Sequence, residues 1–146
     1  MYFVDRKTIE EKLSLMEEYL QLLNSKNDWT SSVDKLALER VVHIVIEAII
    51  DVGNGLIDGF VMRDPGSYED IIEILLDEKV VAEKDAESFK KVVSLRKMVV
   101  RDYTQIDYDL IQQIFKEHHK SLLNFSPAVR QYLKNELGHV TAFIPD

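Results

Sequence analysis

Apolar residues recur at spacings of three and four along almost the whole chain, which predicts an all-helical protein. No segment shows a convincing alternation of apolar and polar residues, so no strand is predicted. A first helix is predicted to begin near Asp5 or Thr8 and to run to about Ser25, since Thr8 and Glu11 have the spacing of a capping box. One face of this helix is apolar and is expected to be buried: Ile9, Leu13, Met16, Leu20 and Leu23.

A second, longer helix is predicted from about Ser32 to Gly59. Its apolar residues cover most of the circumference, which predicts the central helix of a bundle. A single polar stripe runs through it at spacings of three and four: Arg40, His43, Glu47, Asp51, Asn54 and Asp58. Burying such a stripe is costly unless its members pair with one another or face water. The stripe therefore marks either a surface seam or a site.

Helix-breaking residues between Gly59 and Ser67 end the second helix. Ser67 and Asp70 then have the spacing of a capping box, which predicts a third helix that ends near Glu78. A fourth helix is predicted from about Asp85 to Arg101, with its apolar residues turned inward.

Two more helices complete the predicted chain. One runs from Asp107 to about Leu123, and a short last helix begins at Ser126 and Pro127 and stops at Gly138. No internal repeat, low-complexity run or interdomain linker is present. We therefore expect one all-α domain over residues 1–146, an antiparallel four- to five-helix bundle with a short C-terminal helix.

Composition narrows the possible functions. The chain has 146 residues, no cysteine, 18 basic and 26 acidic side chains, and a formal charge of -8. Without cysteine there is no disulfide, cysteine nucleophile or thiolate metal site. The acidic balance argues against broad, charge-driven binding of nucleic acid. Residues 1–12 lack the apolar core of a signal peptide and no stretch is apolar enough to span a membrane, so a cytoplasmic protein with no membrane contact is expected.

The strongest local charge anomaly lies between Lys90 and Arg101, where five basic residues occur without one acidic residue. Arg96 and Arg101 are five positions apart, so they do not share a stripe on an α-helix, although both can turn toward one phosphate at a fraying helix end. The alternative is that these cations only complement the dipole at the C-terminus of a helix.

Metal and cofactor sites have little support in the sequence. His118 and His119 are adjacent rather than three or four positions apart, so these histidines, together with His139, are expected on the solvated surface. Glu47 and Asp51 lie one turn apart but lack a Glu-x-x-His pattern, which makes ion pairing with a basic residue the favoured role. No cofactor and no metal ion are expected.

Two stretches resemble the HepT-like members of the HEPN superfamily, minimal helical-bundle proteins of HepT/MntA toxin-antitoxin pairs. Residues 38–54 are similar to the second helix of that family, with its Glu and Asp-x-Gly step. Residues 95–103, followed by Ile106, Asp107 and Tyr108, are similar to its Arg-x4-His-x-Tyr signature. The resemblance spans about residues 8–123 and implies a HEPN-like bundle that forms a homodimer.

The resemblance implies metal-independent RNA cleavage, in which the motif arginine holds the phosphate and the motif histidine assists proton transfer. Arg96 occupies the arginine position and Tyr103 the tyrosine position, but Arg101 stands where the family has histidine. Arginine stays protonated at any working pH and does not act as a base, although it can hold a phosphate. Tyr103 retains the hydroxyl to which an MntA-type nucleotidyltransferase antitoxin attaches AMP in the family.

Three interpretations remain open at this level. The first is a HepT-like ribonuclease toxin in which Arg96 and Arg101 are catalytic, Glu47 and Asp51 orient them, and His43 supplies a titrating group. The second is a weak or inactive HEPN dimer that binds a nucleotide, RNA or a nucleotidyltransferase through the same groove. The third is a purely structural dimer in which Glu47 and Asp51 consume both arginines.

Overall fold

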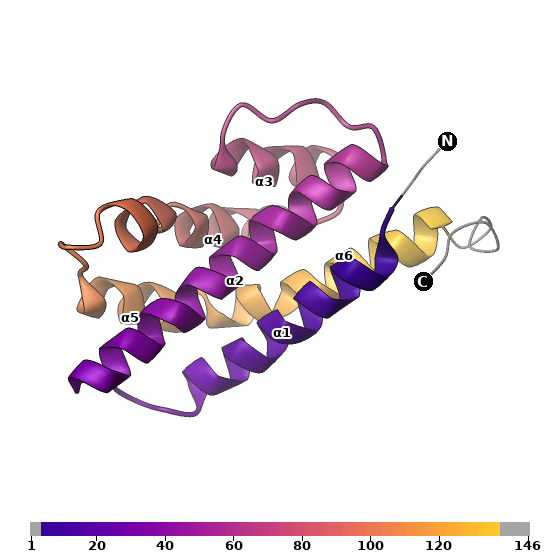
Figure 1. Ribbon diagram of the computed structural model, residues 1–146. Helices are drawn as coiled ribbons and strands as arrows, with labels where there is room; N and C mark the ends of the chain where they lie inside the picture. The colour runs from indigo at the N-terminus through magenta and orange to yellow at the C-terminus, as the bar shows by residue number, and fades with distance from the viewer. Residues whose placement is uncertain (1–3, 138–146) are drawn as a thin grey trace.

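The computed structural model describes residues 4–137 (Figure 1). Within that range the chain forms α1 (Arg6–Asn24), α2 (Ser32–Gly59), α3 (Tyr68–Asp77), α4 (Glu83–Val93), the π-helix η1 (Lys97–Arg101), α5 (Tyr108–Glu117) and α6 (His119–Leu137). No strand occurs in this part of the chain, so the all-helical prediction is confirmed. None of these helices is both long and apolar enough to span a membrane.

Helix α2 is the centre of the bundle, as its apolar circumference predicts. It packs against α1, α3, α4 and η1, and α1 runs antiparallel to it after a short loop (Figure 1). A reciprocal capping box fixes its start: Asp34 N–H donates to Ser31 Oγ at 3.0 Å, and Ser31 N–H donates to the Asp34 carboxylate at 3.3 Å. The predicted bounds of this helix are therefore confirmed.

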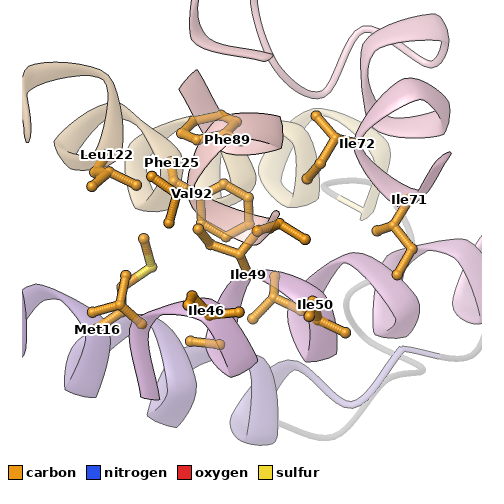
Figure 2. Packing of buried hydrophobic residues seen from close by; sticks show 14 of the residues in the cluster. Met16, Ile46, Ile49, Ile50, Ile71, Ile72, Phe89, Val92, Leu122 and Phe125 are labelled. Carbon is orange, nitrogen blue, oxygen red and sulfur yellow. The ribbon is translucent and has the colours of Figure 1, made fainter. Parts of the chain in front are cut away.

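The core is formed where the other helices close over α2. Figure 2 shows Ile46 and Ile49 of α2 facing Phe89 and Val92 of α4, with Phe125 of α6 beside them. Phe89 and Phe125 meet edge to face with ring centroids 5.2 Å apart. Burial of this shared apolar surface is the main force that holds the helices together.

Side chains also cap the starts of α1, α3 and α5, the last through Asp107, which accepts from Leu110 N–H at 3.0 Å. Asp5 caps α1 by accepting from Thr8 N–H at 3.0 Å and from Thr8 Oγ1 at 2.7 Å, so the box predicted between Thr8 and Glu11 is wrong. Ser67 caps α3 by accepting from Asp70 N–H at 3.0 Å, as predicted.

The fourth predicted helix is divided. Helix α4 ends at Val93, where Ser94 Oγ donates to the carbonyl of Lys91 at 2.6 Å, and η1 follows. A side-chain hydrogen bond to a preceding carbonyl competes with helix continuation, and this competition is not visible in an apolar repeat. Val93 before the break and Leu95 and Val99 after it are all buried, so packing is kept while the backbone widens into the π-helix.

The last helix also differs from the prediction. It begins at His119, after a turn at His118 ends α5 at Glu117, and Pro127 lies inside it. A continuous buried stripe crosses the proline: Leu122, Phe125, Ser126, Val129, Leu133 and Leu137. Its burial outweighs the one backbone hydrogen bond that proline cannot donate. The predicted stop at Gly138 lies outside the described residues.

Helices α2 and α3 both end in a Schellman motif without glycine. After α2, Met62 N–H donates to the carbonyl of Ile57 at 2.9 Å and Val61 adopts φ 54°. After α3, Val80 N–H donates to the carbonyl of Leu75 at 2.8 Å and Lys79 adopts φ 60°. Glycine normally occupies this left-handed position, so both ends are strained.

Candidate functional site

Arg96 is held by a carboxylate from the central helix. Its Nε donates to Glu47 Oε1 at 2.6 Å, and both side chains are only about a quarter exposed, 22% for Arg96 and 27% for Glu47. This hydrogen bond raises the pKa of Arg96 above its ordinary value. The guanidinium is therefore fixed in its charged form at the start of η1.

An aromatic ring lies against the same guanidinium. The Cζ atom of Arg96 is 4.7 Å from the centre of the Tyr68 ring, within the range of a cation–π interaction. Tyr68 is the first residue of α3, so three elements meet at this arginine: α2 through Glu47, α3 through Tyr68, and η1.

The terminal nitrogens of Arg96 remain available. In residues 4–137 neither Nη1 nor Nη2 donates a hydrogen bond, since Glu47 accepts from Nε. These two nitrogens carry four of the five guanidinium hydrogens, and they form the edge that binds a phosphate with two parallel hydrogen bonds.

Arg101 lines the same groove as Arg96. The groove lies between the start of α3 and the end of α4, and its lining includes Ser67, Tyr68, Arg96, Lys97 and Arg101. In η1 the backbone N–H of residue i+5 donates to the carbonyl of residue i, as Asp102 N–H does to Lys97 at 2.9 Å. Residues five positions apart therefore lie more nearly on the same face of the helix than they would on an α-helix. On an α-helix Arg96 and Arg101 would point in different directions, whereas the π-helix lets both face the same groove.

The other cations of the basic window have separate roles. Lys90 forms an ion pair with Glu73 and joins α4 to α3. Lys97 lies 3.7 Å from Asp102 in an exposed ion pair. Arg101 is exposed, and no carboxylate in the described part of the chain pairs with it. The window is therefore not only a complement to a helix dipole.

The polar stripe of α2 is a partly exposed seam, and its members have different partners. His43 Nε2 lies 3.7 Å from Glu47 Oε1, the oxygen that also binds Arg96. Asp51 pairs with Lys12 of α1 at 3.5 Å. No ion pair in residues 4–137 joins Asp51 to Arg101, so the two carboxylates do not consume both arginines.

Tyr103 lies in the turn after η1 and is 67% exposed. No hydrogen bond within the described range involves its hydroxyl group. The hydroxyl is therefore open to a macromolecule that approaches this end of the bundle.

The histidines form no metal site in the described residues, where no group of three metal-ligating side chains occurs. His118 is not a simple surface residue, since its Nδ1 lies 2.8 Å from Ser88 Oγ, a buried hydroxyl. The turn between α5 and α6 places it against α4, which the sequence pattern does not show. His139 lies outside the described residues.

Tyr68 was missed by the sequence analysis. It is 28 positions before Arg96 in the chain, and nothing in its neighbourhood except the capping serine marks it. Only the packing of α3 against α2 and α4 brings it to the arginine. Lys12, the partner of Asp51, could not be predicted either, because only the packing of α1 against α2 brings the two side chains together.

Comparison with known proteins identifies relatives over most of the chain. The ribonuclease HepT-like family matches residues 9–129. The protein named Putative RNase YutE, from Bacillus subtilis, is 48% identical over 143 residues, which cover 98% of this chain and 99% of that protein. The mRNA nuclease HepT of Shewanella oneidensis is 24% identical over 84 residues, 58% of this chain and 63% of that protein.

Solved structures show the same fold. The structure of YutE, a cytosolic protein of unknown function from Bacillus subtilis, matches with a TM-score of 0.93 at 48% identity and covers 98% of this chain and 100% of that one. The tri-AMPylated HEPN toxin of Shewanella oneidensis, in complex with its MNT antitoxin, matches with a TM-score of 0.73 at 18% identity. That match covers 84% of this chain and 96% of the toxin.

Proposed function

The chain belongs to the ribonuclease HepT-like family of HEPN proteins, and from that premise we propose that it is a toxin-type endoribonuclease. It cleaves RNA without a metal ion, and Arg96 and Arg101 bind the scissile phosphate. The observation that carries the proposal is the guanidinium of Arg96, which is fixed through Nε while its two terminal nitrogens donate no hydrogen bond in the described structure.

In the proposed reaction the ribose 2′-hydroxyl loses its proton and attacks the adjacent phosphate, and the bond from phosphorus to the 5′-oxygen of the next nucleotide breaks. The leaving 5′-oxygen takes up a proton, and a cyclic phosphate remains. Negative charge develops on the phosphate oxygens in the transition state. Two guanidinium groups aimed at that charge stabilise it without a metal ion. This is the contribution that Arg96 and Arg101 make.

Proton transfer needs a group other than Arg101, whose side chain stays protonated. We propose His43 for this role. It is a third exposed, and its Nε2 lies 3.7 Å from Glu47 Oε1, the oxygen that also binds Arg96. A neutral imidazole accepts a proton near neutral pH.

We propose further that two copies of the chain form the working site by bringing their grooves together. Two subunits would supply four arginines to a single RNA strand. The start of α2 exposes Val33 and Leu36, which offer apolar surface for such a dimer.

We propose a nucleotidyltransferase antitoxin as the partner that silences the toxin. It transfers AMP from a nucleoside triphosphate to the hydroxyl of Tyr103, and pyrophosphate leaves. The exposure of Tyr103 supports this assignment, as does the AMP-modified HEPN toxin of Shewanella oneidensis. Modification adds a negative phosphate next to Arg101, two positions away, and would compete with RNA.

The test is cleavage of an end-labelled mixed-sequence RNA in EDTA by the wild type, Arg96→Ala and Arg101→His. Intact mass is measured first, so that AMP already attached to the purified protein is detected. We expect cleavage by the wild type, loss of cleavage in Arg96→Ala, and faster cleavage in Arg101→His. Cleavage that persists unchanged in Arg96→Ala would contradict the proposal.

A second candidate function is an inactive HEPN dimer that binds RNA, a nucleotide or the transferase. It is favoured by one observation: no histidine lines the groove that holds both arginines. It predicts RNA binding by the wild type without turnover, and turnover only in Arg101→His.

A further inference from the structure

We infer that Tyr68 is a positioning residue of the arginine site, whose ring fixes the plane of the Arg96 guanidinium. The inference rests on the proposed function, because it names what prepares Arg96 to receive a phosphate of RNA. Tyr68 lies outside both stretches of sequence that resemble the HepT-like family.

The guanidinium needs two restraints to be held in one orientation. A single hydrogen bond from Nε to Glu47 fixes one edge of the group but leaves its plane free to tilt about that bond. The Tyr68 ring at 4.7 Å supplies a surface against the group and so limits the tilt. With both restraints in place, less side-chain entropy is lost when a phosphate binds.

The face of the ring makes the close contact, and the phenolic group adds only a smaller contribution than Glu47 to the raised pKa of Arg96. No hydrogen bond within residues 4–137 involves the Tyr68 hydroxyl, and the residue is 45% exposed in the groove. Phenylalanine at this position should therefore keep the function, whereas leucine keeps apolar volume and loses the π face.

The ring itself is well anchored. Tyr68 is the first residue of α3, and Ser67 caps that helix. Glu73, one and a half turns further along α3, pairs with Lys90 of α4. Helix α3 is thus held by its cap at the start and by its ion pair to α4 further along. The position of Tyr68 therefore does not depend on its contact with Arg96.

A direct test observes the arginine itself. In ¹⁵N NMR spectra the Nε–Hε signal of Arg96 is assigned by its loss in Arg96→Lys. We expect that signal to exchange slowly with solvent and to carry a ring-current shift in the wild type and in Tyr68→Phe. In Tyr68→Leu the shift should vanish and the exchange should accelerate. An unchanged signal in Tyr68→Leu would overturn the inference.

A functional test uses a fluorescein-labelled mixed-sequence RNA and measures binding by anisotropy, together with KM and kcat wherever turnover is detected. Tyr68→Leu should weaken RNA binding about two- to fivefold, and Tyr68→Phe should match the wild type. In the Arg96→Lys background, Tyr68→Leu should have no further effect, because the planar group that the ring orients is gone. Thermal unfolding of each variant confirms that it is folded.

The outcomes separate this inference from the proposed function. If Arg96→Ala binds and cleaves RNA like the wild type, the proposed function fails whatever Tyr68 does. If Arg96→Ala is impaired and Tyr68→Leu is not, only the role of Tyr68 is overturned. Equal impairment of Tyr68→Phe and Tyr68→Leu, or an additive effect in the Arg96→Lys background, would also overturn it.

Discussion

Glu47 Oε1 and Arg96 Nε lie 2.6 Å apart, across 49 positions of sequence, and this bond ties the central helix to η1. We expect Glu47→Ala to lower the free energy of unfolding by about 1 kcal/mol, since the pair is partly exposed and its charge-assisted hydrogen bond is screened by solvent. Urea unfolding measures this change. Glu47→Gln, which keeps an acceptor, should lose less, and equal losses in both variants would contradict the argument.

Gly53 and Gly55 lie two positions apart in α2 but should respond to alanine in opposite ways. A Cβ atom at Gly53 would lie 2.5 Å from Cγ2 of Ile71, where α3 packs against α2. We expect Gly53→Ala to destabilise the fold by about 1–3 kcal/mol through overpacking.

At Gly55 the nearest atom to an added Cβ is Ile9 Cδ1 at 3.6 Å, an ordinary contact. Gly55→Ala should therefore stabilise the protein by about 0.5–1 kcal/mol, the usual gain inside a helix. Both variants are compared by urea unfolding. A gain in stability from Gly53→Ala would show that α3 shifts freely away from α2.

Val61 is expected to be a site of strain that can be relieved. A β-branched residue at φ 54° is unfavourable, so Val61→Gly should raise the free energy of unfolding by about 0.5–1 kcal/mol. Val61 is 77% exposed, so little packing is lost. Val61→Ala retains a Cβ atom and should gain less; a larger gain from alanine than from glycine would refute the assignment of strain.

Asp70 should make the stability of the fold depend on acid pH. Arg63 donates to both of its carboxylate oxygens, at 2.8 and 2.9 Å, and with Gly66 N–H these bonds lower the pKa of Asp70 from 3.8 to about 2. Because the folded-state pKa is the lower one, the unfolded chain binds more protons between these values. The contribution of Asp70 is therefore fully present above about pH 4 and is lost as the pH falls toward 2.

The measurement is thermal unfolding of the wild type and Asp70→Asn between about pH 5 and pH 2. The two proteins should differ in Tm at the upper end of this range and converge at the lower end. A Tm difference that stays constant across the range would contradict the linkage.

Much of this architecture could be predicted from the pattern of residues. The bounds of the central helix follow from its apolar circumference and from Ser31 and Asp34, which are local signals. The break after Val93 could not be predicted, because Leu95 and Val99 continue the apolar spacing through it. The start of α6 could not be predicted, because Pro127 is a strong local signal for the start of a helix. In the structure, burial of the apolar stripe from Leu122 to Leu137 outweighs that signal and the helix runs through the proline.

The site was predictable only in part. Arg96, Arg101 and Tyr103 lie within a few residues of one another, so their grouping can be expected from sequence. Which carboxylate meets which cation depends on how distant helices dock. The sequence placed Glu47 and Asp51 on one face, but did not show that Glu47 meets Arg96 while Asp51 meets Lys12.

Because Glu47 and Arg96 are 49 positions apart, the arginine site forms late during synthesis on the ribosome. A nascent chain that has emerged only through α3 carries the carboxylate and the Tyr68 ring but not the arginine. The arginine becomes ordered only after the segment that follows α4 has left the exit tunnel and docked on α2. If the protein cleaves RNA as proposed, the arginine site is therefore assembled only after most of the chain has left the ribosome.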